Sequence, residues 1–149
     1  MKTRNLLFVL ALMFVAVSQT SAQSATMFSV DDHNVAVGGY DVVTYFTMNK
    51  ATKGEVKYQA IHEGATFYFS SKENLKSFQQ NPSKYAPQYG GYCAYAVANG
   101  GKYPINPETF KIVEGRLFLF YNQDGTNTLT LWNKDEAKLL KAADASWKK

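Results

Sequence analysis

The sequence predicts an α+β domain in which two β-hairpins pack with short helices, as a single small domain. Two segments share one pattern, in which apolar and aromatic residues flank a Glu-Gly pair, at Glu63-Gly64 and again at Glu114-Gly115. Glycine supplies the positive φ of a tight turn, so each segment is predicted to be a hairpin. Helix signals follow both hairpins, which gives the α+β class. The predicted strands are residues 58–62, 65–69, 110–113 and 116–120.

A helix is predicted directly after the first hairpin. The run Ser70-Ser71-Lys72-Glu73 resembles a capping box, in which a Ser hydroxyl accepts a bond from an exposed amide and the Glu reaches back. Leu75 and Phe78 are expected on the buried face of this helix. Asn81-Pro82 is expected to end it, because the residue before proline disfavours helical angles.

Three more short helical segments are predicted further along the chain. Residues 87–101 are rich in small side chains and favour a short helix that ends at Asn99-Gly100, where a left-handed cap costs little. Asn106-Pro107 is typical of a helix N-cap followed by proline, which predicts a single turn through Phe110. Residues 128–147 predict an interrupted helix that packs across the hairpins.

The amino-terminal residues predict a cleaved signal peptide at 1–22. Lys2 and Arg4 precede an apolar run at 6–17, and a small-residue boundary follows at Thr20-Ser21-Ala22. The apolar run is shorter than the roughly 20 residues of a membrane-spanning helix, so no stable membrane anchor is expected. We therefore expect an exported domain at residues 23–149, either periplasmic or extracellular.

Charge and cysteine content exclude some classes of partner and stabilisation. The net charge of +4 owes two units to the predicted signal, and the remaining lysines are scattered, so nucleic acid is not an expected partner. Cys93 is the only cysteine of the chain, which excludes an internal disulfide framework. Stability must come from packing, for which 10 Phe and 10 Tyr residues are present.

Several blocks of the sequence are similar to exported proteins of the YHS domain family. They are Gly39–Phe46, Phe67–Ser71, Asn81–Ala96 and Ala142–Trp147. The resemblance implies a small module that binds metal ions, copper among them, through one His and two Cys of a short core. Those three positions fall on Tyr68, Ser70 and Asn74 here. Hydroxyl and amide groups are poor ligands for soft metals, so metal binding does not follow from this motif.

Cys93 is the first candidate functional residue. Its thiol is a candidate metal ligand or redox group, or else a small buried hydrophobe. Asp41 follows Tyr40 in a Gly-Gly turn, where carboxylates commonly cap backbone amides. The alternative is that the family-like block around Asp41 brings it near Cys93. His33 is the second candidate metal ligand, on a polar arm, with a mobile exposed histidine as the alternative.

A cluster of tyrosines is expected to line a small pocket or to pack the junction between hairpins and helices. Its members are Tyr85, Tyr89, Tyr92, Tyr95 and Tyr103. Tyr89 and Tyr92, together with Tyr40, Asp41 and Cys93, form the candidate binding pocket.

The leading functional hypothesis is an exported, non-catalytic binding module that takes a metal ion or a small molecule. Its most specific version binds copper or zinc through Cys93 and His33. One alternative is a thiol-based redox or small-molecule enzyme, with Cys93 as nucleophile and Asp41 orienting a substrate or water. The other is a structural domain that contacts a protein partner of unknown identity. The sequence contains no complete catalytic motif.

Overall fold

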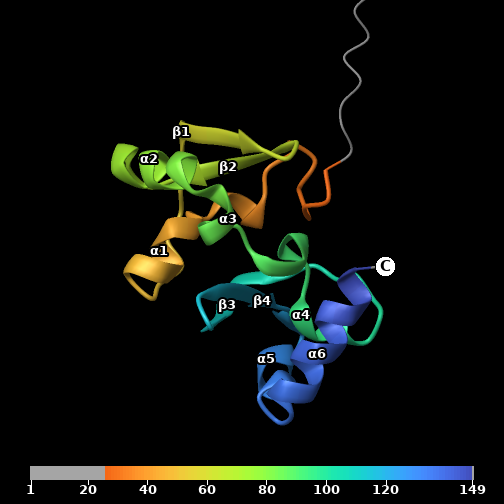
Figure 1. The fold of residues 1–149 in the computed structure, drawn as a ribbon. Helices are drawn as coiled ribbons and strands as arrows, with labels where there is room; N and C mark the ends of the chain where they lie inside the picture. The colour runs from red at the N-terminus through yellow and green to blue at the C-terminus, as the bar shows by residue number, and fades with distance from the viewer. Residues whose placement is uncertain (1–25, 149) are drawn as a thin grey trace, which may run out of the picture.

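The structure is a computed structural model that describes residues 26–148, and the predicted signal peptide lies outside this range. The elements form two tiers, drawn one above the other in Figure 1. The first tier contains η1 (Val37–Gly39), α1 (Val42–Thr47), β1 (Glu55–His62), β2 (Ala65–Phe69), α2 (Lys72–Gln80) and α3 (Pro82–Tyr85). The second contains η2 (Gln88–Gly91), α4 (Ala94–Ala98), β3 (Asn106–Val113), β4 (Arg116–Phe120), β5 (Asn122–Gln123), β6 (Thr126–Asn127), α5 (Thr128–Trp132) and α6 (Glu136–Trp147).

The two predicted hairpins are present, and they match one another in length, turn and irregularity. Both turns consist of a Glu and a Gly with positive φ, 46° and 80° at Glu63-Gly64 and 50° and 72° at Glu114-Gly115. The register of β1 against β2 shifts between residues 55 and 59, and that of β3 against β4 shifts between residues 106 and 110. These hairpins and the helices around them confirm the α+β class.

The helical turn predicted at residues 106–110 is wrong, because this segment begins strand β3. The Asn106 side chain does accept a local bond, from the Glu108 amide at 2.9 Å, but within the irregular start of the strand. Pro107 lies in the same irregularity, where the missing amide proton of proline is tolerated. Its carbonyl oxygen accepts a 2.8 Å bond from the Tyr45 hydroxyl. Local capping signals of this kind do not distinguish a helix start from a bulged strand.

Helix α2 follows the first hairpin as predicted, but its cap is one residue later than expected. The Ser71 hydroxyl oxygen accepts from the Asn74 amide at 3.1 Å, whereas the Ser70 hydroxyl makes a different bond. Phe78 is buried, and Leu75 packs half-buried against the same core. Helix α2 ends before Asn81, as predicted.

Two short helices were not predicted, α1 and α3. The run Val42-Val43-Thr44 at the start of α1 is rich in β-branched residues, which weakens any helical signal in the sequence. Asp41 compensates by capping this helix. Helix α3 is a single turn whose N-cap is Asn81, with Pro82 at its first position.

The helices of the second tier agree with the prediction. Helix α4 ends at Ala98 with Asn99 as its C-cap, and Gly100 follows with φ at 80°, as a left-handed helix end requires. The carboxyl-terminal helix is interrupted between Trp132 and Glu136, which separates α5 from α6. Among the helices within residues 26–148, none combines the length and the apolar character of a membrane span.

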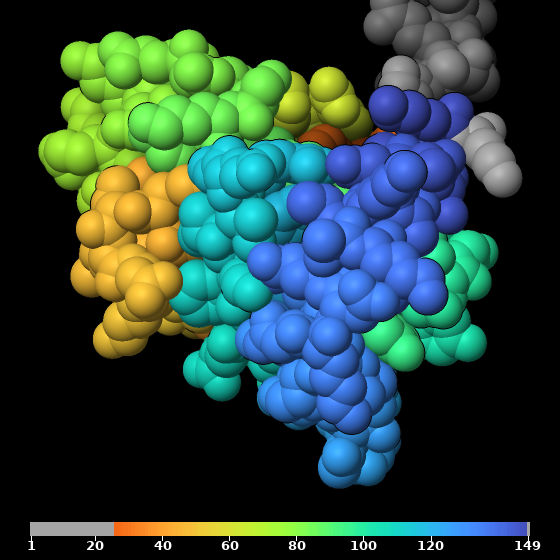
Figure 2. All heavy atoms as spheres, turned by 60° about the horizontal axis from the view of Figure 1, so that its bottom comes forward, coloured from red at the N-terminus to blue at the C-terminus, as the bar shows by residue number. Residues whose placement is uncertain are grey.

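Strand β4 contributes side chains to both hydrophobic cores. Leu117 and Leu119 are fully buried with residues of the first tier, whereas Phe118 and Phe120 are fully buried around Trp132 in the second. This division follows from the period of two along a strand, which sends neighbouring side chains to opposite faces. Figure 2 shows the β3 region, in teal, between the orange and green first tier and the blue carboxyl-terminal helices.

Candidate functional site

Asp41 is a fully buried carboxylate held by four hydrogen-bond donors. Its Oδ1 accepts from the Val43 amide at 2.9 Å and so caps α1. Its Oδ2 accepts from the Ser70 amide at 2.8 Å, the Ser70 hydroxyl at 2.6 Å and the Asn74 side-chain amide at 2.7 Å. These donors replace the water that burial removes from the carboxylate. We call Asp41, Val43, Ser70 and Asn74 the Asp41 node, which ties α1 to the end of β2 and to α2.

The family resemblance assigns its two Cys positions to Ser70 and Asn74, and these two side chains lie together in the Asp41 node. The Asn74 amide nitrogen is 3.3 Å from the Ser70 hydroxyl oxygen. The assigned His position, Tyr68, packs its ring over Gly39, where a Cβ would lie 3.2 Å from the ring. At the positions where the resemblance implies metal ligands, Ser70 and Asn74 are therefore engaged in hydrogen bonds within the protein.

Cys93 stands directly before α4 and is also fully buried. Its Sγ lies 3.3 Å from the Thr128 hydroxyl oxygen, and that hydroxyl donates to the Tyr121 carbonyl oxygen at 2.9 Å. A hydroxyl has only one proton, so the Cys93 thiol must be the donor in its contact with Thr128. The sulfur and the Thr128 oxygen then have only lone pairs left to offer.

A cavity of about 520 Å³ lies beside this pair, and we call it the Cys93 cavity. Its walls are mainly apolar and come from α4, from the connection after α4 and from the segment that joins β4 to α5. The volume falls within the range of small-molecule sites in proteins. The lining residues are Cys93, Tyr95, Ala96, Asn99, Gly101, Tyr103, Tyr121, Thr126 and Thr128.

The five tyrosines expected to line a pocket are distributed over several places. Tyr95 and Tyr103 line the Cys93 cavity, and Tyr103 is exposed at its edge. Tyr89 lines a second cavity. Tyr85 is buried in the first core, and Tyr92 packs half-buried against the second. The two readings of the cluster, pocket and packing, therefore each hold for some of its members.

The remaining candidate residues each contact a different set of neighbours. Asp41 bonds to residues of the first tier, whereas the partner of Cys93 comes from α5. The Tyr40 ring lies under the Lys53 ammonium, 4.4 Å from its centroid. His33 stands in an exposed turn, in which its amide donates to an aspartate side chain at 2.9 Å. Among the hydrogen bonds of residues 26–148, none joins Asp41 to the thiol.

The residues described do not fit a copper or zinc ion. Within residues 26–148, no three His, Cys, Asp or Glu side chains come together as a metal site requires. Structural zinc sites in proteins use four such ligands, and copper sites combine thiolates with imidazoles or thioethers. Cys93 has a threonine as its neighbour, and His33 is exposed while Cys93 is buried.

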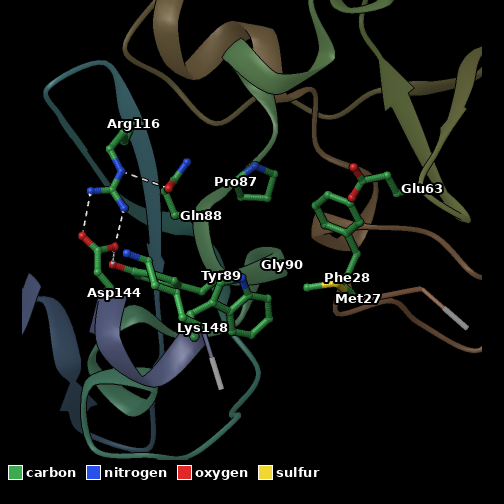
Figure 3. Close-up of a pocket in the computed structure, with 11 residues that line it drawn as sticks. Met27, Phe28, Glu63, Pro87, Gln88, Tyr89, Gly90, Arg116, Asp144 and Lys148 are labelled. Carbon is green, nitrogen blue, oxygen red and sulfur yellow. Dashed lines mark hydrogen bonds and ion pairs between the residues drawn. The ribbon is translucent and has the colours of Figure 1, made fainter. Parts of the chain in front are cut away.

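The second cavity, of about 250 Å³, lies where the segment around Met27 meets η2 and the end of α6, and Figure 3 shows its lining. Arg116 donates to the two Asp144 carboxylate oxygens at 2.6 and 3.3 Å, and the Tyr89 hydroxyl donates to the same carboxylate at 2.8 Å. The bond from Arg116 lowers the pKa of Asp144, and burial, followed by the Asp144 carboxylate, raises the pKa of Tyr89. Arg116 and Tyr89 donate their hydrogen bonds to Asp144, so we interpret this cluster as structural.

Gly90 allows the amino-terminal segment to approach this cavity closely. The Gly90 carbonyl oxygen accepts from the Ser29 amide at 2.7 Å. A Cβ at Gly90 would lie 2.3 Å from the Met27 carbonyl oxygen, which is closer than real atoms approach. The backbone there also has a positive φ of 59°, which favours glycine.

Sequence reasoning missed Thr128 and Tyr121 at the Cys93 cavity, and the partners of Asp41. The His62 ring is half-buried beside Phe28 and Phe78. One signal in the sequence relates the two sites. The same three residues, Gly-Gly-Tyr, precede both Asp41 and Cys93.

Comparisons with known proteins identify the first tier of this structure. The model of the YHS domain family matches residues 43–89, which run from α1 to the start of η2. No curated protein and no solved structure matches the chain. The chain therefore carries a YHS domain at residues 43–89, which confirms the family resemblance seen in its sequence.

Proposed function

We propose that the chain is an exported, non-catalytic binding module that holds a small, mainly apolar molecule in the Cys93 cavity. The observation that carries this proposal is the cavity itself, about 520 Å³ in volume and walled by the rings of Tyr95, Tyr103 and Tyr121. Concave sites with apolar walls and a few polar groups are the usual form of small-molecule sites. The signal-peptide pattern at residues 1–22 supports export, and an exported module works in the periplasm or outside the cell.

A binding role suits the state of Cys93 better than a catalytic one. A nucleophilic thiol must reach its substrate and must ionise readily. Cys93 is fully buried, and its thiol proton is directed at the Thr128 hydroxyl oxygen. Such a thiol contributes to the shape of the cavity and holds the Thr128 hydroxyl in place.

The test is the binding of N-phenyl-1-naphthylamine, a neutral probe whose fluorescence rises in apolar surroundings. We expect saturable binding to one site per chain, weakened at least about tenfold by Ala96→Phe, because this half-buried residue of α4 lines the cavity. The matched control is Ala137→Phe on α6, an exposed alanine that is not among the lining residues. Equal affinity in the wild type and both variants would contradict the proposal, as would a lack of saturable binding.

The copper or zinc version of the binding role has a test of its own. Because the ligand set around Cys93 is incomplete, we expect metal analysis of the folded protein to give the same copper and zinc content for the wild type and Cys93→Ala. One equivalent of either metal in the wild type, lost in Cys93→Ala, would restore the metal-binding version in place of the small-molecule one.

A further inference from the structure

The backbone takes the same path before Asp41 and before Cys93. Three consecutive positive φ angles occur in each segment, 53°, 57° and 75° at residues 37–39 and 54°, 59° and 76° at residues 89–91. The tyrosine that follows is extended in both, with φ of −82° and −73°. Left-handed backbone at a valine or a tyrosine is uncommon, so the coincidence of two such runs indicates a common design.

The hydrogen bonds around the two positions also correspond. The Asp41 amide donates to the Thr52 carbonyl oxygen at 2.8 Å, and the Cys93 amide donates to the Tyr103 carbonyl oxygen at 3.0 Å. A short helix follows each position, and each helix is followed by one of the two matching hairpins. Residues 37–80 and 89–132 are therefore two copies of one structural unit, in which Asp41 and Cys93 occupy the same place.

The two copies differ in the connection that packs against Asp41 in the first copy and Cys93 in the second. In the first copy two residues, 70–71, connect the hairpin to the next helix, and they bring Ser70 and Asn74 onto the carboxylate. In the second copy seven residues, 121–127, make this connection, and they include the small hairpin β5–β6. Tyr121 and Thr126 from this longer connection line the Cys93 cavity. The space that the first copy fills with its own side chains is thus open in the second.

The chemistry of the cavity floor defines what can enter it. The Thr128 hydroxyl proton goes to the Tyr121 carbonyl oxygen and the thiol proton goes to Thr128, so the Thr128 oxygen, at the floor of the cavity, offers an acceptor and no donor. In the first copy the corresponding acceptor is the Asp41 carboxylate, which accepts from the Asn74 side-chain amide. Aromatic walls favour a flat apolar ring.

We propose that the Cys93 cavity is the open counterpart of the Asp41 node and that it selects a flat, mainly apolar molecule carrying one N–H or O–H donor. This inference rests on the proposed function, and it adds the polarity and orientation of the ligand. The donor of the ligand points at the Thr128 oxygen, and its ring lies among the tyrosines.

Indole and 1-methylindole test this selection, because they share a ring system and differ in the N–H donor. In displacement of bound N-phenyl-1-naphthylamine, we expect indole to bind at least about tenfold more tightly than 1-methylindole. Thr128→Val should remove most of this preference and leave the affinity for 1-methylindole unchanged. Thr130→Val, an exposed threonine of the same helix, is the matched control and should keep the preference.

The possible outcomes separate the two proposals. Equal binding of indole and 1-methylindole by the wild type would overturn the donor selection and leave the apolar binding module standing. Displacement by neither compound, with saturable probe binding, would also overturn the selection. Lack of saturable probe binding by the wild type would overturn the binding module and this inference together. The comparison in the wild type holds even if Thr128→Val fails to fold.

Discussion

Asp41→Asn is expected to lower the free energy of unfolding by about 3 kcal/mol. The carboxylate is fully buried, and its two oxygens accept from Val43, Ser70 and Asn74. An asparagine offers a single acceptor oxygen, so its amide nitrogen faces a buried donor whichever way the side chain turns. Chemical denaturation monitored by circular dichroism measures the loss.

The matched control for Asp41→Asn is Asp124→Asn. Asp124 is exposed in the turn between β5 and β6 with a positive φ of 52°, a conformation that asparagine tolerates well. This variant should change the free energy of unfolding by less than about 0.5 kcal/mol. Equal denaturation midpoints for the two variants would show that the Asp41 node contributes nothing to stability.

Gly90→Ala is the second substitution with a large expected effect, about 3 kcal/mol of destabilisation. The alanine would have to keep a left-handed backbone, and its Cβ would lie 2.3 Å from the Met27 carbonyl oxygen and 3.2 Å from the Trp147 ring. The amino-terminal segment must then move away and lose the bond from the Ser29 amide to Gly90. Loss of protection of the Ser29 amide against hydrogen exchange is a local measure of this movement.

Gly100→Ala separates the backbone strain from the collision. Gly100 has a larger positive φ of 80°, but a Cβ there meets nothing within 4 Å. Its substitution should therefore destabilise by only about 1 kcal/mol, the cost of the left-handed backbone. If thermal unfolding of the two variants shows the same loss, close packing of the amino-terminal segment against Gly90 is not important.

The sequence was a good guide to the elements whose signals are local. Glu63-Gly64 and Glu114-Gly115 predicted both hairpins, because a turn depends on its own residues. The wrong predictions came from sequence patterns that are compatible with two different structures. Asn106-Pro107 fits a helix start or a bulged strand, and only the pairing with β4 decides between them. The N-cap of α2 is Ser71 and not Ser70, because the Ser70 hydroxyl donates to the distant Asp41 carboxylate.

The candidate site was predictable as residues but not as an arrangement. Asp41 and Cys93 stand out in the sequence, yet their side-chain partners lie 29 and 33 positions away for Asp41 and 35 for Cys93. No spacing rule links positions so far apart, since the connections between them vary in length. The Cys93 cavity depends on one such connection, at residues 121–127, for which the sequence analysis predicts no element.

Strand β4 packs into both hydrophobic cores, and this determines how the protein unfolds. Leu117 and Leu119 complete the first core, and Phe118 and Phe120 complete the second, so neither core can open without disturbing the strand that both need. Melting of one copy of the repeat therefore removes the support of the other, and the chain unfolds as one cooperative unit. Despite its internal repetition, the molecule cannot be cut into two independently stable halves: residues 43–89 alone would lack the leucines that seal their core.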